Sequence, residues 1–206
     1  MNLKQDDYQK IFKAYASSST AIISDNLERE PGAIGIRPFH QCKAPMVGRA
    51  LTVRTRAGDN LYIHRALGMI EPGDVVIVDG GGDISRALVG EIMMSIARSR
   101  GAVGLVLDGA IRDVDAISAG GFPVFAKAAI HRGPYKNGPG DINVPVCIGG
   151  MFVKPGDIVV GDWDGVVAFS PDIADELLLK VQKQEENEQQ ILVSIVNGTY
   201  TDAYSK

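Results

Sequence analysis

The chain has few of the features that mark secreted and membrane proteins. Its two cysteines, Cys42 and Cys147, lie far apart and form no Cys-x-x-Cys pattern, so we expect both to be reduced. No apolar run approaches the ~20 residues that span a membrane. The polar, acidic start of the chain lacks the apolar core of a signal peptide. We therefore expect a cytoplasmic protein.

Positive charge is also scarce. Lysine and arginine number 21 against 25 acidic residues, the net charge is −4 and there is no basic block, so direct nucleic-acid binding is not expected. The composition is otherwise ordinary for a globular protein, with 45% hydrophobic and 22% charged residues. Without an internal repeat or a linker, residues 1–206 are expected to form a single domain.

Several catalytic motifs are missing. The glycines at 80–82 are followed neither by the Gly-Lys-Ser/Thr of a P-loop nor by dinucleotide-binding spacing. There is no Gly-x-Ser-x-Gly nucleophile motif. The histidines show no metal-ligand spacing and are expected to be structural: His40, His64 and His131. Lys127 is the candidate for a Schiff base, but a lysine at a strand end is more often solvated or ion-paired.

The predicted elements begin with helices, alternate between β and α, and end with a run of β and a long helix. Spacing and caps predict helices over 8–15, 20–27, 61–67 (with Asn60 as the cap), 87–99 and 172–196, and a short helix that follows Arg112-Asp113 and runs through Ser118. Apolar patterns predict strands over 48–55, 75–79, 103–107, 124–126, 144–148, 157–161 and 165–169. This order favours a layered α/β/β sandwich over a doubly wound parallel sheet. The last helix is polar around residues 183–190, which indicates that it projects or touches a partner subunit.

The stretch 80–113 is expected to bring charged residues to one crevice. Glu91 lies near a predicted helix start, and Arg112-Asp113 comes just past a predicted strand, with twenty residues between Glu91 and Arg112. A helix followed by a strand returns the chain to the edge it left, and ligands of α/β folds collect at such strand ends and helix N-termini. The plain alternative is a tight turn at 80–82 and a solvated Arg-Asp surface pair.

The residue types in this crevice suit a 2-keto acid. Arginine binds a carboxylate through two parallel hydrogen bonds, as Arg112 could do. Asp113 is the hard oxygen ligand that Mg²⁺ or Mn²⁺ accepts, with water and substrate completing the coordination. The amides of Ile92 and Met93 near the helix start could hold a carboxylate. The loop 131–142, dense in glycine and proline, is long enough to be functional.

Four segments together resemble a known family. They are Gly90-Glu91, Arg112-Asp113, residues 133–146 (GPYKNGPGDINVPV) and residues 155–167 (PGDIVVGDWDGVV). They are similar to the 4-hydroxy-4-methyl-2-oxoglutarate/4-carboxy-4-hydroxy-2-oxoadipate aldolases, a family that includes regulator of ribonuclease activity A. The resemblance runs from Ser19 to the last helix. It implies a swivelling β/β/α sandwich that forms homotrimers or dimers of trimers, with active sites between subunits.

The resemblance implies a lyase. It would be a divalent-metal-dependent (class II) aldolase that cleaves 4-hydroxy-4-methyl-2-oxoglutarate, or a similar 4-hydroxy-2-keto acid, to pyruvate and a keto compound, and that also decarboxylates oxaloacetate. Asp113 matches the metal ligand, Arg112 the pyruvate-binding arginine, and Glu91 an acidic residue that contacts metal-bound water. The segment Gly90 to Met93 would bind the pyruvyl carboxylate through the Ile92 and Met93 amides. A neighbouring subunit would add a glutamate, for which the candidates are Glu185, Glu186 and Glu188.

Two alternatives stay open. The first is a non-catalytic protein-binding protein of the ribonuclease-regulator type, although those regulators lack the aspartate that follows the arginine and this chain has Asp113. The second is an aldolase or lyase for another keto or sugar acid, because the sequence does not determine the group beyond C4. The preferred metal and the choice between trimer and hexamer are open as well.

Overall fold

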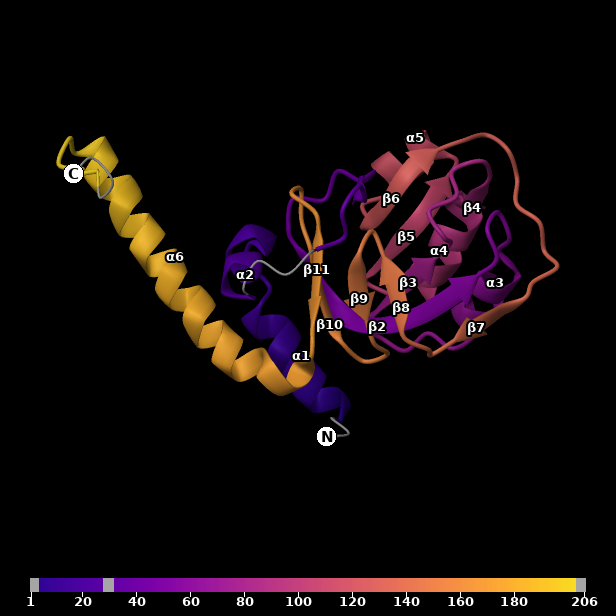
Figure 1. Ribbon diagram of the computed structural model, residues 1–206, viewed down its shortest axis with the longest axis horizontal. Helices are drawn as coiled ribbons and strands as arrows, with labels where there is room; N and C mark the ends of the chain where they lie inside the picture. The colour runs from indigo at the N-terminus through magenta and orange to yellow at the C-terminus, as the bar shows by residue number, and fades with distance from the viewer. Residues whose placement is uncertain (1–3, 28–31, 203–206) are drawn as a thin grey trace.

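A curled nine-stranded sheet forms the centre of the computed structural model, which describes residues 4–27 and 32–202 (Figure 1). Its main path runs β1-β6-β5-β3-β2-β10-β11, with β4 beside β5 and β7 beside β2. The strands are β1 (Arg37–Pro38), β2 (Met46–Thr55), β3 (Asp74–Asp79), β4 (Ala87–Val89), β5 (Gly104–Ile111), β6 (Val124–Ala129), β7 (Gly140–Ile142), β10 (Ile158–Gly161) and β11 (Val166–Phe169). A separate hairpin consists of β8 (Val146–Ile148) and β9 (Met151–Val153).

The helices fall into two groups. The crossover helices α3 (Leu61–Leu67), α4 (Glu91–Ser99) and α5 (Val114–Ala119) connect the parallel strands β2, β3, β5 and β6. The others are α1 (Gln5–Ala14), α2 (Thr20–Asn26), the 3₁₀ turn η1 (Pro171–Ile173) and α6 (Ala174–Val196). Because the four strands are parallel, their carboxyl ends lie at one edge of the sheet, where ligands of such folds bind.

The apolar run of β3 follows from burial on both faces. Val76 and Val78 belong to the core beneath α3 and α4, whereas Val75 and Ile77 face the core that contains the β8–β9 hairpin. A strand covered on both faces reads as a continuous apolar run rather than an alternating one. The sheet is thus the middle layer between helices and a second β layer.

A third core lies on the outer side of β10 and β11, where α1, α2 and the start of α6 pack. The buried residues of α6 are Ala174, Leu177 and Val181, all in its first half. The rest of the helix leaves the body (Figure 1). None of the helices in the described part of the chain is long and apolar enough to cross a membrane.

These observations confirm the layered α/β fold and the projecting last helix. One predicted helix was wrong at its start, because residues 87–89 form β4 and α4 begins only at Glu91. The backbone explains the difference, since the Ala87 amide donates to the Arg132 carbonyl and the Val89 carbonyl accepts from the Arg112 amide. Strand β5 also continues to Ile111, so Arg112 follows it directly. The hairpin strand β9 was not predicted.

Candidate active site

The end of β5 and the start of α4 bring the predicted residues together. The Glu91 amide donates a hydrogen bond to Asp113 Oδ2 over 3.0 Å, and Arg112 Nε lies 3.8 Å from the same oxygen. The Arg112 and Asp113 side chains are half-exposed, at 46% and 42%. Glu91, Arg112 and Asp113 therefore lie next to one another, whereas the predicted shared crevice and their chemical roles stay predictions.

Two backbone features hold the Asp113 carboxylate against α4. Asp113 has φ 59° and ψ 41°, the left-handed conformation that aspartate and asparagine adopt more readily than other side chains. Gly90, the residue before α4, has an extended backbone, but a Cβ there would overlap Asp113 Oδ2 and lie 3.1 Å from Arg112 Cγ. Gly90 therefore serves close approach rather than an unusual φ.

A cavity of about 160 Å³ opens beside this pair. One side consists of Gly90, Ile92, Met93, Arg112 and Asp113. The others are formed by β4 and by Asn60, His64, Pro134 and Lys136. Helix geometry leaves the amides of Ile92 and Met93, in the first turn of α4, without intrahelical acceptors. The volume suits a small organic acid and is below the range of sites for drug-sized ligands.

Glu91 is not among the described residues that line this cavity. It borders a separate, open hollow along α4, together with Ile92, Ser95 and Ser99. The carboxylate is exposed and lies beside the Asp113 site rather than inside it. Any contact between Glu91 and a ligand must therefore be made from the cavity rim.

Sequence patterns missed three polar residues that line the cavity: Asn60, His64 and Lys136. Asn60 had been predicted to cap α3, but its side chain does not do so. Asp59 Oδ1 accepts the Leu61 amide instead. The Asn60 Nδ2 group donates to the Leu88 carbonyl over 2.9 Å. Its buried Oδ1 has no hydrogen-bond partner in the described part of the chain, so an acceptor remains beside the cavity.

His64 also lines the cavity, although its spacing gave no sign of it. Burial lowers the pKa of His64 below its ordinary value, and the positive charge of Lys136 lowers it further. The imidazole is therefore neutral at pH 7 and adds no charge to the site.

The cavity could bind a metal through one protein carboxylate. Across residues 4–27 and 32–202, no group of three or more histidine, cysteine, aspartate or glutamate side chains is placed to hold a metal ion. Asp113 is the one carboxylate among the described residues that line the cavity, and it would hold the ion together with water and substrate oxygens. Mg²⁺ accepts this arrangement because it usually keeps several waters.

Lys127 had been predicted to lie at a strand end, but it lies inside β6. Its Nζ atom lies 2.7 Å from Asp108 Oδ1, in an ion pair that is mostly buried. A Schiff base would require this amine to leave its partner and reach a substrate carbonyl. The ion-paired interpretation of Lys127 is the one that the geometry supports.

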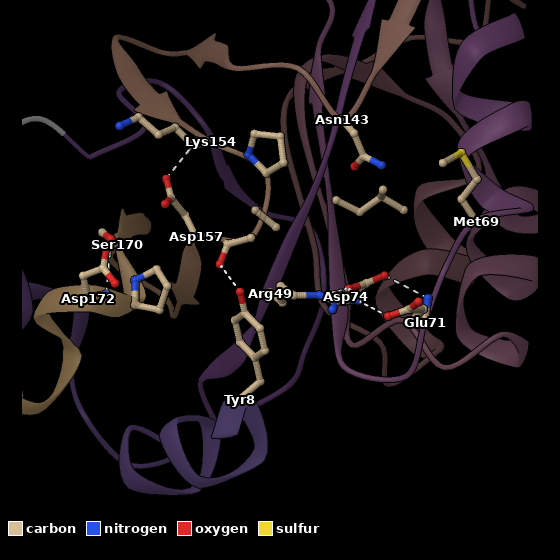
Figure 2. A pocket seen from close by; sticks show the side chains of 15 residues that line it. Tyr8, Arg49, Met69, Glu71, Asp74, Asn143, Lys154, Asp157, Ser170 and Asp172 are labelled. Atoms are coloured by element: carbon tan, nitrogen blue, oxygen red, sulfur yellow. Dashed lines mark hydrogen bonds and ion pairs between the residues drawn. The ribbon is translucent and has the colours of Figure 1, made fainter. Parts of the chain in front are cut away.

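A larger cavity, about 620 Å³, lies between α1 and the sheet (Figure 2). Several of its charged side chains are already paired. Arg49 binds Glu71 at 2.6 Å and Asp74 at 2.8 Å, Asp157 accepts the Lys154 amide, and the Tyr8 hydroxyl donates to the Gly156 carbonyl. These contacts join α1 to the sheet and leave few polar groups directed at a ligand.

The model of the RraA-like family, described as Aldolase/RraA, matches residues 20–168. A protein of Halalkalibacterium halodurans named "Putative 4-hydroxy-4-methyl-2-oxoglutarate aldolase" is 37% identical over 171 residues, which are 82% of this chain and 81% of that one.

Solved structures show the same fold. An uncharacterized protein from Pseudomonas syringae superposes with a TM-score of 0.82 at 26% identity, over 93% of this chain and 94% of that chain. The RNA-processing inhibitor RraA of Thermus gives a TM-score of 0.67 at 29% identity, over 74% of this chain and 93% of that chain.

Proposed function

Because the chain belongs to the RraA-like family, we propose that it is a lyase: a divalent-metal-dependent aldolase that cleaves 4-hydroxy-4-methyl-2-oxoglutarate or a similar 4-hydroxy-2-keto acid to pyruvate. The supporting observation is the shared cavity in which Arg112, Asp113 and the first amides of α4 converge. The family relatives named as aldolases support the same reaction class.

In this proposal the chain holds the substrate at its pyruvyl end. Arg112 and the amides of Ile92 and Met93 bind the carboxylate, and Asp113 binds the cation. A bound divalent cation polarises the 2-keto oxygen and stabilises negative charge on it. The C3–C4 bond then breaks, its electrons form the enolate of pyruvate, and the C4 hydroxyl loses its proton to become a carbonyl.

The remaining residues handle charge and protons. Arg112 stabilises the developing enolate by electrostatic attraction. We assign Glu91, on the rim beside Asp113, to orient the water that accepts the C4 hydroxyl proton. Water also protonates the enolate at C3 to give pyruvate. Loss of CO₂ from oxaloacetate leaves the same enolate, so one site serves both reactions.

Metal removal tests the proposal. Pyruvate release from oxaloacetate and from 4-hydroxy-4-methyl-2-oxoglutarate, followed with lactate dehydrogenase, is expected to stop in EDTA and to return with Mg²⁺ or Mn²⁺. The reason is that the Arg112 charge alone does not neutralise both the carboxylate and the enolate. Full activity in EDTA, or trapping of the substrate on Lys127 by borohydride, would contradict this mechanism.

A non-catalytic regulator is the second candidate, favoured by the likeness to the Thermus RraA structure. Asp113 argues for the enzyme, since a regulator has no need of a carboxylate held at the cavity by its backbone conformation. The absence of pyruvate from every 4-hydroxy-2-keto acid tested with Mg²⁺ and Mn²⁺ would favour the regulator.

We also propose that the protein acts in the cytoplasm as a homotrimer or a dimer of trimers. The far end of α6 exposes apolar side chains that no part of the described chain covers: Ile191, Leu192, Val193, Ile195 and Val196. The same helix carries Glu185, Glu186 and Glu188, and it packs on α1 and α2 rather than on the cavity elements α3 and α4. These glutamates could complete only a neighbour's site.

Light scattering at assay concentration is expected to give at least three times the 22.0 kDa chain mass. Dilution below the dissociation constant should lower specific activity, because each site would lose its neighbour. A monomer with full specific activity would contradict sites between subunits.

A further inference from the structure

Strand β5 contains a bulge just before it reaches the candidate site. The pairing of β5 with β6 slips by one position between Leu107 and Ala110. Two residues of β5, Asp108 and Gly109, therefore lie opposite one residue of β6, Lys127. A β-bulge of this kind bends a strand, and bulges next to active sites re-aim the side chains that follow them.

The bulge is also the point at which β5 changes its neighbour. β4, β5 and β6 lie side by side (Figure 1). Up to Asp108 the strand pairs with β3, and from Ala110 onward it pairs with β4. β4 leads into Gly90 and α4, and the Arg112 amide donates to the Val89 carbonyl over 3.0 Å. The bulge therefore determines how Arg112 meets the start of α4.

Side-chain and loop contacts hold the bulge. The Lys127 ammonium lies 2.7 Å from Asp108 Oδ1, so the residue opposite the bulge is bonded to the bulge itself. Asp108 Oδ2 accepts the Gly149 amide over 3.3 Å, and the Asp108 carbonyl accepts the Gly82 amide over 3.1 Å. A Cβ on Gly82 would lie 2.9 Å from Lys127 Nζ, so the glycine-rich loop 80–82 packs directly over the ion pair.

The ion pair lies outside the substrate cavity. Neither Asp108 nor Lys127 is among the described residues that line it. Asp108 is 5% exposed, and burying a carboxylate is costly unless a cation and hydrogen bonds compensate it. A buried pair adds little net stability compared with apolar side chains of similar volume, so stability alone does not account for it.

We propose that Asp108 and Lys127 are positioning residues for the reaction: their ion pair fixes the bulge in β5 and thereby the place of the Arg112 guanidinium against α4. The inference rests on the proposed function, in which Arg112 stabilises the enolate. In this role neither side chain of the pair touches the substrate. Because a misplacement of about 1 Å is enough to slow catalysis, a relaxed bulge lowers turnover even in a folded protein.

The double variant Asp108→Asn/Lys127→Met tests this role. It removes the ion pair without leaving an unpaired buried charge, so it is expected to fold. Its kcat for pyruvate release from oxaloacetate with Mg²⁺, measured well below its melting temperature, is expected to fall by ~10–10²-fold. A pair that only stabilised the fold would lower the melting temperature and leave the kcat of the folded protein unchanged.

The ion pair between Arg49 and Asp74 supplies the matched control. Its length is 2.8 Å and Asp74 is also buried, but Asp74 is the first residue of β3 and lies at the opposite edge of the parallel strands from Arg112. The double variant Asp74→Asn/Arg49→Met should lower the melting temperature and keep the parental kcat. A parental kcat in Asp108→Asn/Lys127→Met, or an equal loss of kcat in both double variants, would overturn the assignment.

Hydrogen exchange separates this inference from the proposed function, because it needs no turnover. In Asp108→Asn/Lys127→Met the segments 87–91 and 110–113 should exchange at least ~10-fold faster, whereas β10 keeps the parental rate. Faster exchange confined to these segments, without pyruvate release by the parent protein, supports the positioning of Arg112 and refutes the aldolase. Parental exchange in both segments refutes the positioning role and leaves the aldolase to the metal test.

Discussion

Replacing Arg112 by Lys is expected to lower kcat for oxaloacetate decarboxylation by about 10²–10³-fold, the usual cost of losing one strong charge-stabilising contact. Lysine keeps the positive charge but not the planar fork that binds a carboxylate through two hydrogen bonds. The guanidinium also lies 3.8 Å from Asp113 Oδ2, a relation that an ammonium cannot reproduce from the same backbone position. Steady-state kinetics across a range of Mg²⁺ concentrations measures the loss.

Asp113→Asn is the companion variant. Asparagine tolerates the left-handed backbone at this position and its amide oxygen can still accept the Glu91 amide, so folding should be retained. The lost charge should weaken metal binding, and high Mg²⁺ should partly restore activity, whereas it should not rescue Arg112→Lys. Near-parental activity in both variants, with normal melts, would show that the site is elsewhere. Unfolding of both would show that the pair is structural.

Asp59→Ala is expected to destabilise the fold by about 3 kcal/mol, because it leaves three backbone amides without their acceptor. Asp59 is fully buried and joins the start of α3 to the loop that carries Lys136. For a chain of this length the melting temperature should fall by about 6–12 °C. The melting temperatures of the parent protein and Asp59→Ala should be compared at one fixed protein concentration, because assembly would make the melting temperature depend on concentration.

Asp141→Ala is the matched control, because Asp141 forms a half-exposed ion pair with Arg54 at 2.7 Å. Such surface pairs contribute about 0–1 kcal/mol. If both aspartate variants melt alike, the amide contacts of Asp59 do not stabilise the fold.

Acid should remove the Asp59 contribution. Burial alone would raise the pKa of Asp59, but hydrogen bonds from the backbone amides and the Arg56 charge bring it below its ordinary value. A lowered pKa in the folded state stabilises the protein above the unfolded pKa of about 4, and this stability is lost as pH falls toward the folded pKa. The difference in the free energy of unfolding between the parent protein and Asp59→Ala should therefore decrease below about pH 4 and stay constant above it.

The sequence predicted what depends on local patterns. Helix 61–67 and most strands were predicted, because spacing, turn residues and apolar runs are local signals. The error at 87–89 has a tertiary cause, since the backbone of that segment pairs with residues 112 and 132, which are distant in the chain. Local propensity carries no information on such pairing.

The same division applies to the candidate site. Arg112, Asp113 and the α4 amides lie at a strand end and a helix start, which sequence patterns locate. Asn60 and His64 reach the cavity from α3, and their exposure to it depends on how α3 packs against β4. The 131–142 loop was recognised by its composition, but the position of Lys136 within it depends on the buried Asp59, whose contacts no pattern indicated.

Burial of both faces of β3 affects how the register of the sheet is determined. When both faces of a strand are apolar, a slip by one residue exchanges one apolar set for another, so polarity cannot select the register. Shape can do so. A Cβ on Gly104, which pairs with Val75 of β3, would overlap the Met46 sulfur, and a Cβ on Gly48 of β2 would lie 2.8 Å from Val75 Cγ2. A shifted register would place larger side chains at positions where only glycine fits. Side-chain volume thus selects the register where both faces are apolar.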